Sequence, residues 1–220
     1  GVDVVKAAAN QVREDFKTHF AFGENWSAYA DKLTAEQIDQ AKKSLALLAG
    51  KDLSGKKILD IGCGSGLHAL AALQCGAEHV TAMDIDENSV ATARGLLEKY
   101  WNKKNYECRA GNVLTGAGIP AGGFDIVYSW GVLHHTGAMW EAVENAASHV
   151  RPGGRLIIAL YLETPFCGFW EKEKKFFTRM PRLVQMPMAW LYSALCVMRL
   201  LAKGVNPLRF IREYHSSRGM

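Results

Sequence analysis

A glycine-rich turn between an apolar strand and an apolar helix constrains the fold of this chain more than any other segment. Residues 57–61 (Lys-Ile-Leu-Asp-Ile) have the composition of a short buried strand, and residues 67–73 (Leu-His-Ala-Leu-Ala-Ala-Leu) that of a helix. Gly62, Gly64 and Gly66 lie between them at alternate positions. A glycine turn that opens a helix brings bare backbone close to a ligand, so we expect a nucleotide-type site here.

The spacing of these glycines separates two classes of ligand. A dinucleotide fingerprint, G-x-G-x-x-G, would place its third glycine at position 67, but that residue is Leu67. The third glycine is Gly66 instead. The spacing therefore disfavours a nicotinamide dinucleotide dehydrogenase. A purely structural tight turn would look similar, so the surrounding sequence has to decide.

The composition is that of a folded protein without an obvious polyanion-binding arm. The chain has 220 residues, of which 49% are hydrophobic, and a formal net charge of +4. This length suits one sizeable α/β domain with an accessory segment. No run of Lys or Arg suggests a nucleic-acid partner, and no signal peptide is visible. The scattered cysteines without a C-x-x-C pair suggest reduced thiols and a cytoplasmic location.

Strands and helices alternate along the middle of the chain. Thr34 is expected to cap a helix over 35–49, with Gln37 completing a capping box and Gly50 ending the helix. An amphipathic helix is expected over 1–20. The alternation predicts an α/β fold with a doubly wound, mostly parallel sheet. The expected strands are 57–61, 79–83, 106–109, 124–129 and 155–161, and the expected helices between them are 66–75, 87–100 and 138–149.

The segments that flank this alternation differ from it. We expect residues 1–50 to form an N-terminal helical lid, 51–162 the core, and 163–220 a helical cap or tail, all within a single domain. Prolines punctuate the tail, and it shows no clear pair of strands.

Three motifs in the core resemble those of class I S-adenosylmethionine (SAM) methyltransferases. The segment Asp60–Gly66 (Asp-Ile-Gly-Cys-Gly-Ser-Gly) resembles their motif I. Residues 124–135, with F-D-x-V and V-L-H-H, resemble motif IV and the following loop in enzymes of the ubiquinone-biosynthesis type. Residues 151–154 (Arg-Pro-Gly-Gly) resemble the turn before the fifth strand. Together these motifs span residues 57–161, about half of the chain.

The resemblance implies a Rossmann-like sheet, SAM as the methyl donor and S-adenosyl-L-homocysteine as the product. In this family the sheet normally ends with a hairpin after the fifth strand. Because the tail shows no strand pair, we expect either that the chain is a fragment of a longer protein, which we favour, or that the hairpin is lacking.

The resemblance also implies which residues contact the cofactor. Asp84, at the end of the second strand, would accept hydrogen bonds from the ribose hydroxyls; the alternative, a helix cap, suits Asp86 better. Asp60 would hold the methionine ammonium, directly or through water, unless it is a capping carboxylate. The expected cofactor-binding residues are Asp60, Gly62, Cys63, Gly64, Gly66, Asp84, Ile85, Asn112, Val113, Ser129 and Trp130.

Asn112 departs from the usual family pattern, in which an Asp contacts the adenine amino group. An amide oxygen can make the same hydrogen bond, although Asn is also common in turns. Trp26 and Trp130 would bound the adenine, the sulfonium or the substrate, or else fill the core. We expect Trp26, Tyr29 and Tyr161 to belong to a lid and substrate-contacting set.

His134 and His135 are the candidate general bases, because a histidine with a pKa of about 6.5 suits proton removal at neutral pH. His134 is the preferred one, with a structural or substrate-shaping role as the alternative. Tyr161 and Glu163 are weaker candidates. The sequence shows no carboxylate cluster for a metal-dependent mechanism, so we expect no metal.

The tail contains an apolar helix over 187–203 that is short of the roughly 20 residues of a membrane span. Three roles are open: a cap over the substrate, which we favour, an oligomer contact, or binding to a membrane surface. The last would be aided by the basic residues Lys172, Lys174, Lys175, Arg179 and Arg182.

The sequence therefore predicts a SAM-dependent methyltransferase that acts on an O, N or C atom of a small molecule. A SAM-binding module without methyl transfer is the alternative from another class. A nucleic-acid methyltransferase is disfavoured, because no Asn/Asp-Pro-Pro-Tyr/Phe motif follows the fourth strand. No nucleic-acid partner is expected, and the oligomeric state stays open.

Overall fold

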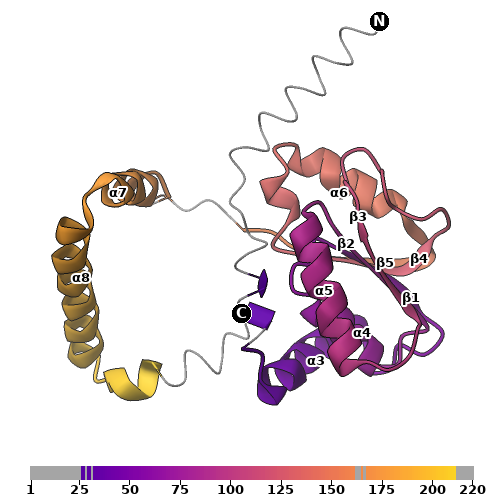
Figure 1. Ribbon diagram of the computed structural model, residues 1–220, viewed down its shortest axis with the longest axis horizontal. Helices are drawn as coiled ribbons and strands as arrows, with labels where there is room; N and C mark the ends of the chain where they lie inside the picture. Colours follow the sequence, from indigo (N-terminus) through magenta and orange to yellow (C-terminus); the bar gives the residue numbers. More distant parts are fainter. Residues whose placement is uncertain (1–25, 28, 31, 162–164, 166, 212–220) are drawn as a thin grey trace, which may run out of the picture. The chain divides into compact units, whose positions relative to one another are not determined.

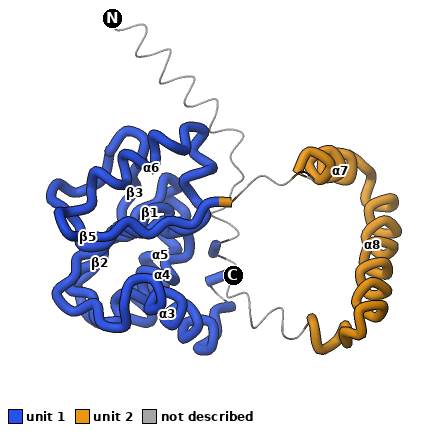
Figure 2. Tube along the Cα trace, turned by 180° about the vertical axis from the view of Figure 1, so that it is seen from behind, with its two compact units in different colours: residues 1–160 blue, residues 161–220 orange. Residues whose placement is uncertain are grey.

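A computed structural model describes residues 26–27, 29–30, 32–161, 165 and 167–211. The chain divides into two compact units, residues 1–160 and 161–220 (Figure 2), and each is described by itself. The helix that we predict over 1–20 lies outside the described residues.

The first unit is built on a parallel five-stranded sheet (Figure 1). Every neighbouring pair of strands is parallel, and the strand order is β3-β2-β1-β4-β5. Helices lie in every connection between consecutive strands except that from β3 to β4, and this arrangement confirms the predicted α/β fold with a Rossmann-like sheet. The strands are β1 (Lys57–Ile61), β2 (His79–Asp84), β3 (Tyr106–Ala110), β4 (Phe124–Trp130) and β5 (Val150–Ala159).

Helices cover both faces of this sheet. Figure 1 shows α6 on one face and α4 and α5, with α3 beyond them, on the other. A short 3-10 turn, η2, follows β4. The elements are α3 (Ala35–Ala49), α4 (Leu67–Gln74), α5 (Glu87–Tyr100), η2 (Leu133–His135) and α6 (Met139–Ser148).

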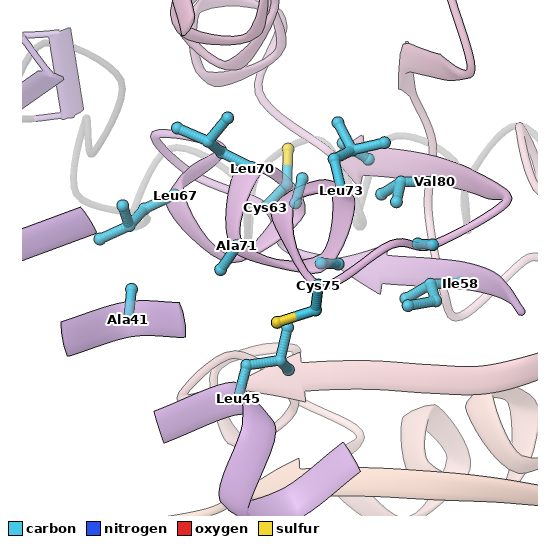
Figure 3. Close-up of a cluster of buried hydrophobic side chains, with 14 of the residues drawn as sticks. Ala41, Leu45, Ile58, Cys63, Leu67, Leu70, Ala71, Leu73, Cys75 and Val80 are labelled. Carbon is cyan, nitrogen blue, oxygen red and sulfur yellow. The ribbon is translucent and has the colours of Figure 1, made fainter. Parts of the chain in front are cut away.

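The two covered faces explain why β1, β2 and β4 are mostly buried, whereas the edge strand β3 is only partly buried. In β1, Ile58 belongs to the cluster under α3 and α4, whereas Leu59 and Ile61 belong to the cluster under α6. Successive side chains of a strand point to opposite faces, so both sets are buried. Figure 3 shows part of the first cluster, in which side chains of α3 (Leu45), α4 (Leu70) and the strands (Ile58) meet. The N-terminal segment that we expect as a lid thus contributes α3 to the core.

The sequence locates most element boundaries within a residue or two. Thr34 caps α3 and forms the capping box with Gln37, and Asp86 rather than Asp84 caps α5. Within the first unit, the strand β5 is the exception, because it begins at Val150 instead of 155. Its pairing with β4 shifts register between Phe124 and Ile126, so the expected turn 151–154 is an irregularity within the strand.

The second unit contains the helices α7 (Cys167–Arg179) and α8 (Arg182–Ala202). The sequence predicts a helix start at Pro187, a residue that favours first turns, but α8 begins at Arg182 and includes this proline. The side-chain amide of Gln185 donates to the carbonyl oxygens of Phe177 (3.2 Å) and Met180 (2.7 Å). These bonds cap the end of α7 and fix the turn into α8. After β5, the described residues include no strand.

Asp125 ties three strands together at the amino ends of the sheet. Its Oδ2 accepts from the backbone N–H of Lys57 in β1 at 2.9 Å. Its Oδ1 pairs with the guanidinium of Arg151 in β5 and lies 3.5 Å from Nζ of Lys56. Burial alone would raise the pKa of Asp125, but the Lys57 N–H and the two cations outweigh it and lower the pKa.

We expect Asp125→Asn to lower the free energy of unfolding by about 1–3 kcal/mol at pH 7, because it removes a buried charge with cationic partners. A carboxyl with a lowered folded-state pKa stabilises above its unfolded pKa of about 3.9, and the contribution is lost as pH falls through the folded value. Urea unfolding at pH 7 and at an acid pH below the unfolded pKa should therefore show that the free-energy difference between Asp125→Asn and the parent protein is smaller in acid. Asp39→Asn, which breaks an exposed pair with Lys43, is the control and should change nothing measurable. An equal loss in both variants would contradict the assignment.

Candidate functional site

The candidate site lies where the order of the sheet reverses. From β1 the chain continues to β2 on one side, whereas β4 pairs with β1 on the other. In open parallel sheets, ligands bind outside the carboxyl ends of the strands at this switch point. The glycine turn, the end of β2 and the loop after β4 all lie at these carboxyl ends.

The glycine turn is held by the backbone of β2. The N–H groups of Gly62 and Cys63 both donate to the carbonyl oxygen of Met83, at 2.7 and 2.9 Å, and Gly66 donates to the Cys63 carbonyl at 2.8 Å. Gly62, Gly64 and Gly66 have φ values of 73°, 51° and 81°. These left-handed conformations are ones that glycine adopts without strain.

Close packing adds a second reason for glycine at these positions. A Cβ at Gly62 would lie 2.5 Å from the Val132 side chain, which follows β4. A Cβ at Gly64 would lie 2.7 Å from the Trp26 ring, and one at Gly66 would lie 2.9 Å from Ala93 of α5. The turn therefore brings together the β4 loop, the segment around Trp26 and α5, three parts that are distant in the sequence.

Asp84 binds this turn directly. Its Oδ2 accepts from the N–H of Gly64 and its Oδ1 from the N–H of Asp86, each at 3.0 Å. Burial raises the pKa of Asp84, and these N–H groups oppose the shift. Each oxygen keeps a further lone pair for another donor.

Asp60 is the most unusual charged group at the site. Its side chain is only 4% exposed, and Oδ2 is buried without a hydrogen-bond partner. Burial, and after it the charge of Asp84, raises the pKa of Asp60 to about 7, while the N–H of Ala69 acts in the opposite direction. An unpartnered buried carboxylate oxygen is costly, so this group suits a cationic or hydrogen-bonding ligand.

An aromatic set lies beside these carboxylates. The rings of Tyr128 and Trp130 stack at 5.9 Å with a 6° interplanar angle, and the His68 ring lies 5.1 Å and 6.4 Å from them. Trp130 is 42% exposed, whereas Tyr128 is buried. Burial lowers the pKa of His68 to about 4, so its imidazole is neutral at pH 7.

His68 and Tyr128 are not among the site residues predicted from the sequence. The sequence does show His68 as the one aromatic residue in an otherwise apolar first turn after Gly66. Its contact with Trp130 depends on the pairing of β4 with β1, which the local sequence does not reveal.

Other predicted cofactor residues have structural partners. The Ser129 side chain is fully buried and its hydroxyl donates to the Ile61 carbonyl at 2.9 Å, so it joins β4 to β1. Oδ1 of Asn112 accepts from the Leu114 N–H at 2.9 Å, which is the turn role. Val113 lies in the core under α6. By contrast, Ile85 is 50% exposed directly after Asp84.

His134 and His135 form η2, whose preceding residue Val132 packs against Gly62. Their rings lie 4.0 Å apart at 49°. His134 is partly buried and His135 is exposed. Burial, and after it the charge of His135, lowers the pKa of His134. His134 is therefore neutral, and able to accept a proton, at neutral pH.

The predicted lid and substrate residues are only partly brought to the site. Trp26 lies against the glycine turn, and Tyr29 meets it edge to face at 5.9 Å. Tyr161 is exposed and belongs to the second unit, and Glu163 lies outside the described residues. Across the part of the chain that the structure describes, no three His, Cys, Asp or Glu side chains are grouped as a metal site.

The sequence matches the model of a known protein family. The model of a family described as a methyltransferase domain matches residues 33–201, which is most of the chain. The chain belongs to this family. The resemblance seen in its motifs is thus confirmed.

Curated relatives match part of the chain. A tRNA U34 carboxymethyltransferase of Idiomarina loihiensis is 35% identical over 110 residues, 49% of this chain and 33% of that protein. A ubiquinone biosynthesis O-methyltransferase of Coxiella burnetii is 34% identical over 107 residues, 49% and 44% of the two chains. A 27-O-demethylrifamycin SV methyltransferase of Amycolatopsis mediterranei is 30% identical over 149 residues, 67% and 52%. The chain thus spans from a third to about half of these relatives.

Solved structures agree on the fold. The magnesium protoporphyrin IX methyltransferase of Synechocystis, solved with bound SAH, has a TM-score of 0.51 at 23% identity, covering 64% of this chain and 63% of that one. The YcgJ protein of Bacillus subtilis also has a TM-score of 0.51, at 19% identity, covering 64% and 58%. At this identity, the likeness shows the shared methyltransferase fold.

We expect Gly64→Ala to destabilise the first unit more than Gly55→Ala does. Gly55 has a similar φ of 68° but no atom near its missing Cβ, so it reports the backbone cost alone. The clash with Trp26 should add about 1–3 kcal/mol to the loss of unfolding free energy in urea. In a Trp26→Ala background this excess should vanish. If it persists there, the predicted contact between Trp26 and the turn is wrong.

Proposed function

We propose that the chain binds SAM at the carboxyl ends of β1 and β2 and transfers its methyl group to a small molecule. The observation that carries this proposal is Asp60, whose Oδ2 is buried without a partner beside the glycine turn. The ammonium of the methionine part, or a water that it binds, would satisfy this oxygen. The family match and the three left-handed glycines support the same ligand.

The remaining residues suit the other parts of SAM. Asp84 accepts one N–H on each oxygen and has lone pairs left for the two ribose hydroxyls. Ile85 offers an exposed apolar side chain for the adenine ring. Asn112 uses Oδ1 in a turn, and its second lone pair would accept from the adenine amino group. Cys63 and Val113 would contribute their backbone, because their side chains are buried.

Bound SAM supplies an electrophilic methyl group on a sulfonium. The chain's own contribution is to position the acceptor and to exclude water. Trp130, stacked on Tyr128 and 42% exposed, presents a rigid aromatic face for the sulfonium or for the acceptor. Trp26 packs against the glycine turn at Gly64 and, with Tyr29, would act as the lid.

His134 is the proposed general base. Its lowered pKa leaves the imidazole neutral at pH 7, and the packing of Val132 on Gly62 holds its loop beside the cofactor turn. It would accept the proton that an oxygen or nitrogen acceptor loses on methylation. The adjacent His135 is exposed and is the second candidate.

A small-molecule acceptor is favoured over a nucleic acid. Two of the relatives are named for small molecules, namely for ubiquinone biosynthesis and for a rifamycin, and one is named for a tRNA. Residues 1–160, which hold the site, contain sixteen Lys and Arg against eighteen Asp and Glu. A net negative charge does not favour a polyanion at the site.

Free thiols at Cys63, Cys75 and Cys108 suit a reducing compartment such as the cytoplasm.

Calorimetry with SAM should detect binding that is linked to Asp60. With a pKa of about 7 before binding, this group would release a proton when it meets an ammonium. SAM affinity should therefore fall as pH falls below 7, towards about tenfold per pH unit. Asp60→Asn should weaken binding and flatten this dependence. Asp52→Asn, on an exposed loop, is the control. The proposed role is refuted if the variant keeps the slope of the parent protein.

Methyl-transfer screening of small phenols, amines and hydroxy compounds tests the His134 role. The acid limb of kcat/KM for the acceptor, measured with SAM saturating, should lie below the usual imidazole pKa of about 6.5, because burial lowers the pKa of His134. His134→Gln should reduce kcat by about 10²- to 10⁴-fold and remove this limb, with SAM affinity unchanged. His135→Gln is the matched control. SAM binding without transfer to any acceptor would favour the non-catalytic alternative.

A further inference from the structure

The helix α8 presents an uncovered apolar face. The apolar side chains of α8 that are more than half exposed include Leu183 (87%), Trp190 (74%), Leu191 (64%), Leu201 (59%) and Met198 (56%). We call this set the apolar face. No residue of α8 is buried. Contiguous exposed apolar surface of this kind marks a site of interaction with a partner or a membrane.

The neighbouring helix α7 does not cover this face. Its Trp170 meets Tyr192 at 6.5 Å, and its last carbonyls bind Gln185. Gln185, Tyr192 and Arg199 follow one another every seven residues and so lie on one side of α8. Leu183, Trp190 and Leu201 fall on the opposite side at the same helical spacing. The contact with α7 therefore leaves the apolar face pointing outward.

The apolar surface continues beyond the end of α8. A groove is lined by Val197 and Leu201 of the helix and by residues of the following segment. The other lining residues are Gly204, Val205, Asn206, Pro207, Leu208 and Ile211. Leu208 is 79% exposed, which extends the apolar surface to the last described turn.

Positive charge is concentrated in the same unit. Residues 161–220 hold ten Lys and Arg against four Asp and Glu, a net charge of +6. Residues 1–160 have a net charge of −2, so the whole positive excess of the chain lies in the α7–α8 unit. Anionic lipid attracts basic residues by about 1 kcal/mol for each one near the surface. The exposed basic side chains of the two helices include Lys172, Lys174, Lys175, Arg179, Arg182 and Arg199.

The geometry favours a helix that lies on a membrane rather than one that crosses it. By length and mean hydropathy alone, α8 is long and apolar enough to cross a membrane. Arg182 and Arg199, however, lie within the helix, and the rise between them is about 25 Å, less than the roughly 30 Å of a hydrocarbon core. Polar side chains occupy one side only. An amphipathic helix with basic flanks and a tryptophan on its apolar side suits the interface.

We propose that the α7–α8 unit binds the surface of an anionic lipid bilayer, with the apolar face of α8 inserted at the level of the headgroups. The basic side chains would contact the lipid phosphates, and Trp190 would lie at the boundary with the acyl chains. This inference does not depend on the proposed methyl transfer.

Vesicle flotation of the full chain tests the proposal. The protein should bind vesicles of phosphatidylcholine with phosphatidylglycerol, and bind pure phosphatidylcholine much more weakly. In about 1 M salt, where the screening length falls to about 3 Å, the preference for anionic vesicles should largely disappear. Absence of binding to the anionic vesicles, or equal binding to both kinds, would overturn the proposal.

Two variants of α8 separate insertion from charge. Leu191→Glu and Ser193→Glu each add one negative charge at an exposed position, two residues apart and on opposite sides of the helix. Leu191→Glu should lower the partition coefficient about tenfold or more beyond the effect of Ser193→Glu, because only Leu191 would be buried in lipid. Circular dichroism checks that both variants keep their helices, and SAM calorimetry checks the first unit.

Each other occupant of the apolar face predicts a different result. If the face binds a second copy, the parent protein sediments as a dimer, Leu191→Glu as a monomer, and vesicles do not bind. If it caps the acceptor site, Leu191→Glu raises KM for the acceptor while vesicle binding stays as in the parent. Equal vesicle binding by the two variants would also overturn the insertion step.

Discussion

The close approach of backbone to backbone at the glycine turn is the constraint on which the rest of the site depends. The carbonyl of Met83 accepts from both Gly62 and Cys63, and Asp84 accepts from Gly64, so the end of β2 fixes the turn after β1. A side chain at Gly62 or Gly64 would displace Val132 or Trp26. Because Val132 of the β4 loop and Trp26 rest on bare glycines, one turn sets the relative position of Val132, Trp26 and Asp84.

The sequence predicted the elements well where local chemistry determines them. The helix over 35–49 has its capping box and its closing glycine, and the strands have runs of apolar residues; all of these signals lie within a few residues. The start of β5 and the start of α8 were missed for a common reason. In each case a proline suggested the boundary, but the element begins before it. Val150 of β5 already pairs with Phe124 of β4, and Gln185 in the first turn of α8 is bonded to the Met180 carbonyl after α7.

The site was predictable in its residue types but not in its partners. Asp60, Asp84 and the glycines follow from the order of motif and strand. The hydroxyl of Ser129 donates to the Ile61 carbonyl, and the His68 ring lies near Trp130. Both contacts join residues that are more than sixty positions apart in the sequence. Such contacts arise from the strand order, and the sequence pattern gives only the alternation of strands and helices, not the neighbours in the sheet.

The buried carboxylate of Asp60 and the partly buried one of Asp84 would link stability to ligand binding. Asp60 and Asp84 each lose solvation, and their mutual repulsion raises the pKa of Asp60 further. A sheet that served only as a scaffold would be more stable with apolar residues at these positions. Their cost is offset when a cation or hydroxyl donors fill the space, so a ligand that carries both should stabilise the folded state in proportion to its affinity.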